Sequence, residues 1–108
     1  MPEVSVIVAT YRRENELKRA LESLKEQQFK SFETIIVDDN ADLEYNSKVS
    51  GIVDAFKVEN PQMSITLITN PKNMGSAETR NIGINASRGE YITFLDDDDI
   101  YLPQKIQN

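Results

Sequence analysis

The stretch Val4-Ser5-Val6-Ile7-Val8-Ala9 is short, rich in β-branched residues and nearly all apolar. Such a run predicts a β-strand that is buried on both faces of a sheet. The same pattern predicts three more strands, at Phe32–Val37, Ser64–Thr69 and Glu90–Leu95. Strands of this kind are typical of a parallel sheet, because helices then cover both of its sides.

Three helices are predicted between these strands. Apolar residues recur at i, i+3, i+4 and i+7 from Glu14 to about Gln28, which indicates an amphipathic helix. The same spacing predicts a second helix that ends near Val58 and follows a polar loop over Ala41–Ser47. A third helix is expected from a cap at Ser76 to about Ser87, with Gly89 just after its end.

The alternation of strands and helices predicts an α/β fold. The element order is β-α-β-α-β-α-β, which favours a doubly wound, mostly parallel, Rossmann-like sheet with right-handed crossovers. The chain has 108 residues and no internal repeat, so one domain is expected.

Composition excludes several classes of function. The net charge of −6 argues against a nucleic-acid partner, whose binding surface would be basic. The chain has no cysteine and no histidine, so thiolate and imidazole metal sites are excluded. Any bound metal is therefore expected to be a cation that prefers oxygen ligands, Mg²⁺ or Mn²⁺.

The beginning of the chain predicts a cytoplasmic location. Met1–Val4 carries no basic segment, and the apolar run that follows is too short for a signal peptide. No apolar segment approaches the length that crosses a bilayer. Docking at the inner face of a membrane through another part of the protein stays open.

Polar residues follow each predicted strand. They are Thr10-Tyr11-Arg12-Arg13, then Asp38-Asp39-Asn40, then Asn70, Lys72 and Asn73, then Asp96-Asp97-Asp98-Asp99. Open α/β sheets bind ligands at the carboxyl ends of their strands. Neighbouring strands lie about 4.8 Å apart, so the four clusters are expected within roughly 15 to 20 Å along one edge. A nucleoside diphosphate joined to a sugar has a comparable length.

The aspartate run is the sharpest feature. Like charges on neighbouring residues repel one another and call for a counter-charge or full solvation. In an extended chain Asp96 and Asp98 point to one side, where they could hold Mg²⁺ or Mn²⁺ together with substrate phosphates. Asp97 points to the other side, towards a ribose hydroxyl. The alternative interpretation is a solvated acidic turn that caps a short helix.

Other residues of the strand ends are candidates for nucleotide contacts. The carboxylate of Asp39 could accept the ring N–H of uracil, although Asp-Asp-Asn also suits an Asx-turn. Tyr11 could stack on a base and Thr10 could hydrogen-bond to base or phosphate, or both could be ordinary packing residues. Arg80 lies in the third helix, where a solvated arginine is the plain alternative.

Taken in order, these motifs resemble glycosyltransferase family 2. The four matching motifs are Val4–Arg13, then Ile36–Asn40, then Asn73-Met74-Gly75 together with Ala77 and Arg80–Gly83, then Gly89–Asp99. They come in the family's order and spacing, so the resemblance extends over essentially the whole chain. Each motif is weak alone, and the four together are specific. Two residues depart from the family pattern, since Ala9 often is proline there and Arg12 often is asparagine.

The resemblance implies a GT-A fold with an Asp-x-Asp element. It implies that Asp98 binds the metal with help from Asp96 or Asp97. It also implies that Tyr11 and Asp39 contact the base, and that Ala9 and Thr10 line the pocket.

The resemblance further implies an inverting transfer of a sugar, most simply from a UDP-linked donor, to a hydroxyl of a saccharide or lipid-linked saccharide. Family members are longer than this chain. The acceptor site and the catalytic base are therefore expected beyond Asn108, in a protein of which this is the nucleotide-sugar-binding part, and no residue here is assigned as catalytic.

The sequence leaves two alternative functions open, and it predicts that the chain associates with a second copy of itself. A non-catalytic nucleotide-binding module is one rival, and a receiver-type phosphoacceptor domain is the other. A receiver places acidic residues after the first strand, where this chain has Thr10 and Tyr11. Without the neighbouring strand that the family supplies, the fourth strand is expected to be an apolar edge that pairs with a second copy.

Overall fold

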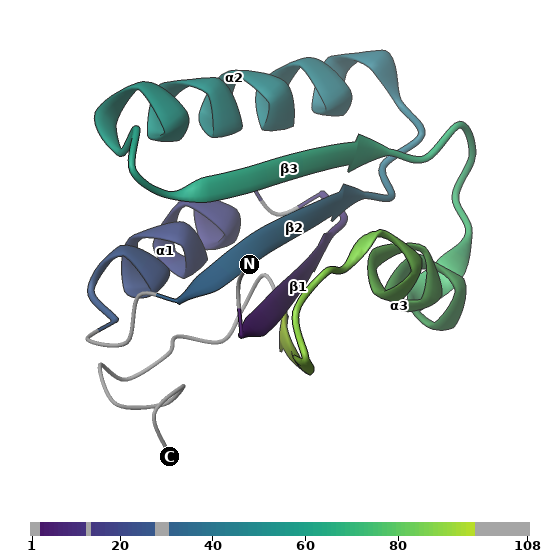
Figure 1. The fold of residues 1–108 in the computed structure, drawn as a ribbon. Helices are drawn as coiled ribbons and strands as arrows, with labels where there is room; N and C mark the ends of the chain where they lie inside the picture. Colours follow the sequence, from purple (N-terminus) through teal and green to yellow (C-terminus); the bar gives the residue numbers. More distant parts are fainter. Residues whose placement is uncertain (1–2, 13, 28–30, 97–108) are drawn as a thin grey trace.

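The computed structural model describes residues 3–12, 14–27 and 31–96. The strands are β1 (Val4–Thr10), β2 (Phe32–Asp38), β3 (Ser64–Thr69) and β4 (Tyr91–Asp96). The helices are α1 (Glu14–Lys25), α2 (Leu43–Glu59) and α3 (Gly75–Ala86). Strands and helices alternate in the predicted order (Figure 1).

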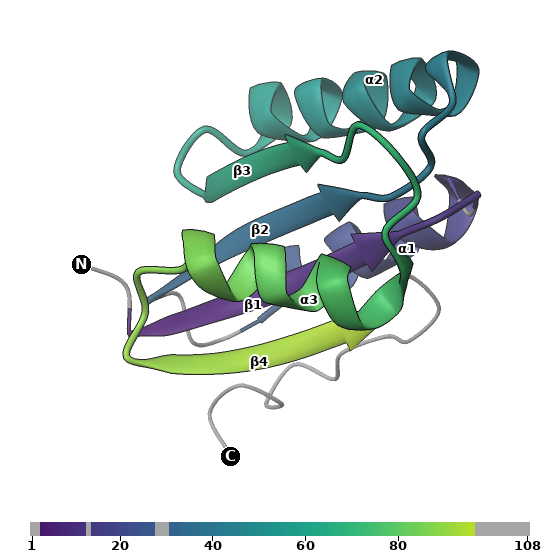
Figure 2. The same ribbon diagram turned by 90° about the vertical axis from the view of Figure 1, so that its right-hand side faces the viewer.

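All four strands are parallel and lie in the order β3-β2-β1-β4. Helices α1 and α2 cover one face of the sheet, and α3 covers the other face, as Figure 2 shows. Helix α3 connects β3 to β4, and these two strands lie on opposite sides of β1 in the sheet. The chain therefore crosses to the second face in this connection. The prediction of a doubly wound, parallel α/β sheet is confirmed.

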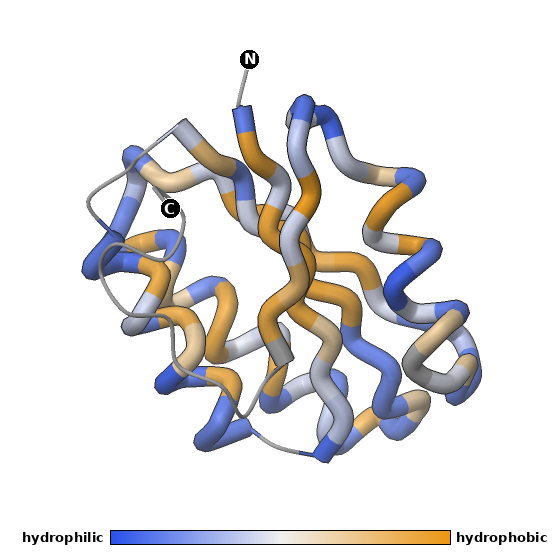
Figure 3. The backbone as a smooth tube through the Cα atoms, turned by 90° about the horizontal axis from the view of Figure 1, so that it is seen from below, coloured by the Kyte–Doolittle hydropathy of each residue, from blue (hydrophilic) through white to orange (hydrophobic). Residues whose placement is uncertain are grey.

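The main core lies between the sheet and the pair α1 and α2. Its centre is formed by buried residues of β1 and β2 together with one face of each helix, namely Val6, Val8, Ile36, Leu17, Leu21, Leu24, Val53 and Phe56. Figure 3 shows hydrophobic residues concentrated along the central strands. The continuous apolar runs of β1 and β2 are needed because both faces of these strands are covered.

The second face is packed more closely. A Cβ atom on Gly83 of α3 would lie 2.5 Å from a side-chain atom of Ile7 in β1. Gly83 therefore lets α3 approach the sheet, and the approach brings the beginning of this helix to the carboxyl end of β2.

Two local predictions were wrong. Helix α2 begins at Leu43, inside the stretch Ala41–Ser47 that was predicted as a loop. Asp42 starts it, since its carboxylate accepts the N–H groups of Glu44 at 2.9 Å and Tyr45 at 3.3 Å. This is a standard N-cap, which satisfies donors that a helix start leaves unpaired.

The predicted start of the third helix also differs, whereas its predicted end near Ser87 is confirmed. Its N-cap is Met74 rather than Ser76, and no side chain of the cap residue hydrogen-bonds to the helix. Gly89 lies beyond the C-cap Ser87 and serves another purpose. A Cβ on Gly89 would meet the backbone N of Ser5 at 2.6 Å, so this glycine allows the turn before β4 to pass against β1.

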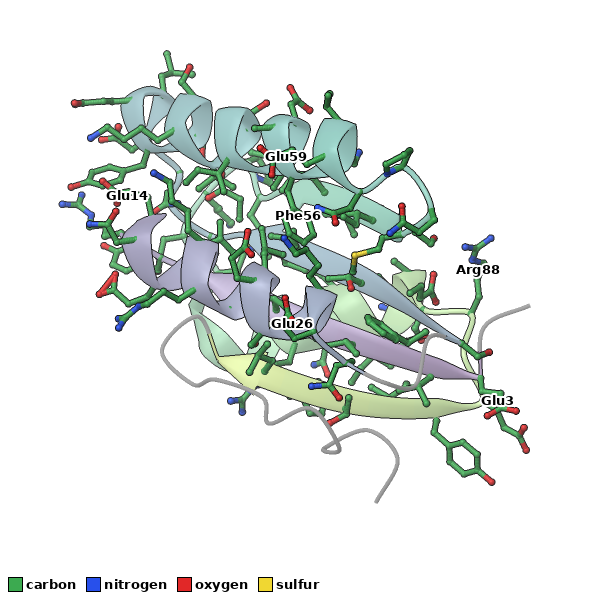
Figure 4. The ribbon with its side chains drawn as sticks, turned by 90° about the vertical axis from the view of Figure 1, so that its left-hand side faces the viewer. Glu3, Glu14, Glu26, Phe56, Glu59 and Arg88 are labelled. Carbon is green, nitrogen blue, oxygen red and sulfur yellow. The ribbon has the colours of Figure 1, made fainter. Side chains whose placement is uncertain are left out.

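That turn is held by a buried carboxylate at the amino ends of the strands. Glu33 of β2 is only 2% exposed and accepts hydrogen bonds from Ser5 Oγ at 2.6 Å and from the Arg88 backbone N at 2.6 Å. The guanidinium of Arg88 lies 3.2 Å from the other carboxylate oxygen. Figure 4 shows Arg88 and Glu3 at the opposite end of the sheet from Glu14.

Candidate functional site

The carboxyl ends of the four strands lie at one edge of the sheet. Thr10 pairs with Asp38, Asp38 pairs with Thr69, and Ala9 pairs with Asp96. The arrowheads of all four strands point the same way in Figure 2. The predicted convergence of polar strand ends is therefore confirmed for the residues that the structure describes.

The end of β1 places three predicted residues at this edge. Ala9 is half-buried, Thr10 is 1% exposed, and Tyr11 is 46% exposed. Within the described residues, the buried hydroxyl of Thr10 and one carboxylate oxygen of its strand partner Asp38 have no hydrogen-bond partner. Unsatisfied buried polar groups destabilise a protein and are uncommon. Two of them at the carboxyl ends of β1 and β2 therefore call for an explanation, such as a ligand that supplies their hydrogen bonds.

Arg12 connects β1 to α2 across the edge. Its backbone has φ of 54°, a conformation that is strained for arginine, and its N–H donates to the side chain of Asn40. Its guanidinium lies 5.5 Å from the ring centre of Tyr11 and 5.2 Å from that of Tyr45. These cation–π contacts hold Arg12 beside the residue that was predicted to stack on a base.

The Asx-turn that competed with a binding role for Asp39 is formed by its neighbour instead. Asp38 Oδ1 accepts the Asn40 backbone N at 2.9 Å and the Asn40 side-chain amide at 2.6 Å. Asp38 is fully buried. The turn therefore leaves the Asp39 side chain directed elsewhere.

The carboxylate of Asp39 holds the loop that begins α3. Its Oδ1 accepts Asn70 Nδ2 at 2.9 Å and the Met74 backbone N at 2.8 Å. Its Oδ2 accepts the Gly75 backbone N at 3.1 Å and Asn73 Nδ2 at 3.2 Å. Asp39 thus joins the end of β2 to the first turn of α3, where a carboxylate also complements the helix dipole.

Asn70 and Asn73 are members of this site whose roles were not predicted. Asn70 is 2% exposed and bridges Asp39 to Thr79 Oγ1, which lies 3.3 Å from its amide nitrogen. The sequence signal was their place after the third strand, in the turn-rich stretch Asn70–Gly75. The sequence did not predict that both would bond to Asp39, because Asp39 is more than thirty residues away in the chain.

Arg80 lies in α3 and stacks on the strand at the edge of the sheet. It is half-buried, and its guanidinium lies 5.5 Å from the ring centre of Phe94 in β4. The plain alternative of a solvated helical arginine therefore does not describe it. The contact holds Arg80 between α3 and β4.

Of the predicted metal ligands, the structure describes only the backbone of Asp96. Asp96 is the last residue of β4 and lies beside Ala9. The side chain of Asp96, and the whole of Asp97 and Asp98, lie outside the described residues. In the part of the chain that is described, no group of three or more His, Cys, Asp or Glu residues could hold a metal ion.

An apolar groove lies away from this edge, between α1 and α2. It is lined by Leu21, Ile52, Ala55 and Phe56 with Lys18, Glu22 and Glu59 around them. It has none of the polar residues of the strand ends. Separately, none of the helices within residues 3–12, 14–27 and 31–96 is both long and apolar enough to span a membrane.

The sequence pattern of the family described as Glycosyl transferase family 2 matches residues 5–108. The chain belongs to glycosyltransferase family 2. Membership confirms the resemblance seen in the sequence and argues against a receiver-type phosphoacceptor domain.

One curated relative in this family is the GalNAc(5)-diNAcBac-PP-undecaprenol beta-1,3-glucosyltransferase of Campylobacter jejuni. It is 36% identical over 99 residues, which are 92% of this chain and 30% of the relative. The chain spans about one third of the length of the curated relatives that it matches.

Two solved structures that bind nucleotide sugars share the fold. The mannosyltransferase PcManGT from Pyrobaculum calidifontis, in complex with GDP-Man and Mn²⁺, superposes with a TM-score of 0.88 at 23% identity, covering 99% of this chain and 31% of that one. S. aureus TarS 1-349, in complex with UDP-GlcNAc, gives 0.79 at 30% identity, covering 99% and 29%. The family-2 chain therefore has the GT-A type of α/β fold.

Proposed function

We propose that this chain is the nucleotide-sugar-binding part of a glycosyltransferase that uses a UDP-linked sugar. One observation supports this most strongly: the ends of four parallel strands, with their polar residues, share one edge of the sheet. The similar S. aureus protein binds UDP-GlcNAc. A nucleotide lying along this edge would meet each strand end in turn.

The base is proposed to lie at the ends of β1 and β2. Tyr11 is exposed enough to stack on a base. Thr10 has a hydroxyl without a partner among the described residues, and half-buried Ala9 lines the pocket beneath it. Asp39 lies across the strand pair as the acceptor for a base N–H. Arg80, held over Phe94, is proposed to contact the donor from the β4 side.

The diphosphate is proposed to lie towards β4, where Asp96, Asp97 and Asp98 follow the strand. Asp96 and Asp98 would hold Mn²⁺ or Mg²⁺, and Asp97 would reach the ribose. The donor set fits such a cation, because carboxylate oxygens are its preferred ligands and Asp96, the first residue of the run, lies beside Ala9. When bound, the cation supplies charge neutralisation for the departing diphosphate.

The reaction is proposed to invert the configuration of the sugar. An acceptor hydroxyl displaces the nucleoside diphosphate at the anomeric carbon after losing its proton to a carboxylate base. Residues of this chain bind and orient the leaving group. The base and the acceptor site are proposed to belong to the remaining two thirds of a family member, so the chain alone is expected to bind the donor without transferring sugar.

The acceptor is proposed to be a saccharide or a lipid-linked saccharide. The name of the Campylobacter relative specifies an undecaprenol-linked substrate. We propose further that the enzyme works in the cytoplasm at the inner face of a membrane, and that its product enters polysaccharide biosynthesis.

Titration with UDP tests the proposed function. We expect UDP to bind more tightly in the presence of Mn²⁺, and Asp98→Ala to weaken the Mn²⁺-dependent binding about tenfold, since one of few charged ligands is lost. Isothermal titration calorimetry measures both effects. Asp54→Ala, an exposed aspartate of α2, is the control and should change neither. Binding that ignores both Mn²⁺ and Asp98→Ala would contradict the proposal.

The outer edge of β4 is proposed to pair with a second copy. Tyr91, Ile92 and Phe94 are 64%, 39% and 42% exposed, and β1 is the only neighbour of their strand among the described residues. We expect light scattering to show dimers, and Ile92→Lys to shift them to monomers, because charged residues block edge pairing. Val58→Lys, at an 81% exposed position on α2, is the matched control. A monomer at high concentration refutes the pairing.

A further inference from the structure

The carboxylate of Asp39 has every acceptor position occupied. A carboxylate offers about four lone-pair sites. Four N–H groups fill them, from Asn70, Asn73, Met74 and Gly75, at distances between 2.8 and 3.2 Å. A nucleobase that donates to Asp39, as the proposed function requires, must therefore displace one of the four donors.

Three of these donors are difficult to displace. The N–H groups of Met74 and Gly75 are main-chain donors at the start of α3, and they move only with the helix. The amide of Asn70 is buried, and its nitrogen also lies 3.3 Å from Thr79 Oγ1. Losing Asp39 would leave one buried N–H of this amide without a partner, which costs about 1 to 3 kcal/mol.

The fourth donor can be exchanged at a lower cost than the other three. Asn73 is exposed, and its 3.2 Å contact with Oδ2 is the longest of the four. The same amide nitrogen also donates to the backbone carbonyl of Asp39 at 3.0 Å. Asn73 can therefore release the carboxylate and still keep one partner, while water reaches its other N–H.

We propose that Asn73 is a specificity-determining residue, whose amide guards Asp39 and yields to a ring N–H of the base. The inference rests on the proposed function and refines it. Uracil, thymine and guanine carry a ring N–H, which can donate one hydrogen bond to Asp39 in place of the one from Asn73. Cytosine presents a lone pair at the corresponding ring nitrogen, which repels the carboxylate, so the exchange discriminates between bases.

Removing the Asn73 amide should strengthen the binding only of nucleotides whose base carries a ring N–H. Asn73→Ala frees one lone pair of Asp39, so UDP should bind about fivefold more tightly, the equivalent of one modest hydrogen bond. Uridine diphosphate methylated at the ring nitrogen (3-methyl-UDP) cannot donate there. It should bind more weakly than UDP to the native chain and gain nothing from Asn73→Ala.

Calorimetry with both nucleotides, in saturating Mn²⁺, makes the comparison. Gln62→Ala is the control, since Gln62 is exposed and precedes β3 at the opposite edge of the sheet. Thermal melting checks that each variant is folded. Asn73→Ser shortens the same side chain and repeats the test if the alanine variant unfolds.

The results separate the inference from the function on which it rests. If Asn73→Ala leaves UDP binding unchanged or weaker, or strengthens both nucleotides equally, the guarding role is overturned while UDP binding stands. If UDP does not bind to the native chain at all, the proposed function and the inference fall together.

Discussion

Replacing Asp39 with alanine is expected to lower the free energy of unfolding by about 4 kcal/mol, at roughly 1 kcal/mol for each hydrogen bond lost. Four donors lose their acceptor at once. Two of them are the main-chain N–H groups of Met74 and Gly75, whose loss of a cap alone is worth about 1 kcal/mol. Urea unfolding followed by circular dichroism measures the change.

The expected loss distinguishes two roles for the same residue. If Asp39 served only to bind a base, Asp39→Ala would weaken nucleotide binding and leave the unfolding midpoint where it was. Asp39→Asn should be intermediate, because one carbonyl oxygen remains and the new amide confronts donors rather than acceptors. Asp54→Ala on the exposed side of α2 should leave stability within about 0.5 kcal/mol of the native value.

Asp39 also explains how two elements on different sides of the sheet are placed. The residue follows β2, and the helix that it caps covers the face opposite α1 and α2. Gly83 lets that helix approach β1, and Asp39 fixes its first turn. The position of Arg80 at the β4 side of the edge depends on both contacts.

The fold was predictable because its two central strands, β1 and β2, are buried on both faces. β1, β2, β3 and β4 each begin and end within one residue of the predicted limits. A strand that lies between two layers of helix has a continuous apolar run, and such a run ends visibly where polar residues begin. Parallel pairing then followed from the helices between the strands.

Helix ends were less predictable, since they depend on single hydrogen bonds. The first turn of α2 has no buried residue, so no apolar spacing reveals it, and only the Asp42 cap marks it. The start of α3 is capped by Asp39, 36 residues earlier in the chain. No local pattern around Ser76 could show a partner that only the folded sheet brings near.

The site was predictable as a location but not as a set of contacts. Topology alone places the ends of parallel strands together, so the end of β1 with Thr10 lies beside the end of β2 with Asp38 and Asp39. Which atoms pair is a matter of tertiary geometry, so the network of Asp39 with Asn70 and Asn73 was not foreseen. The roles of Asp97 and Asp98 stay predictions, to be tested by the Mn²⁺ titration.

The second large loss of stability is expected when Glu33 is replaced. Glu33→Ala is expected to lower the free energy of unfolding by about 3 kcal/mol, since charged acceptors contribute about 1.5 kcal/mol or more for each good hydrogen bond. Ser5 Oγ and the Arg88 backbone N would lose a partner at 2.6 Å. The ion pair with the Arg88 side chain adds little, because that side chain is 57% exposed. Urea unfolding at neutral pH measures the loss.

The stabilisation from Glu33 should depend on pH. Burial raises the pKa of this carboxyl, but hydrogen bonds from Ser5 and from the Arg88 backbone and side chain outweigh it, so the pKa lies below the ordinary value of 4.5. A carboxyl whose pKa is lower in the folded state stabilises fully above its unfolded pKa and loses that contribution as pH falls through the folded pKa. The native chain should therefore lose stability below about pH 4.5.

Glu33→Gln isolates this carboxyl from all others that titrate in the same range. Glutamine keeps the shape and one acceptor oxygen but takes up no proton. The difference in free energy of unfolding between the native chain and Glu33→Gln should be constant between pH 6 and 8 and should shrink below about pH 4.5. A difference that grows on acidification would mean that the pKa of Glu33 is higher in the folded than in the unfolded protein, so that folding favours its protonated form. The network of Ser5, Arg88 and Gly89 would then be held better by a neutral acid than by a carboxylate.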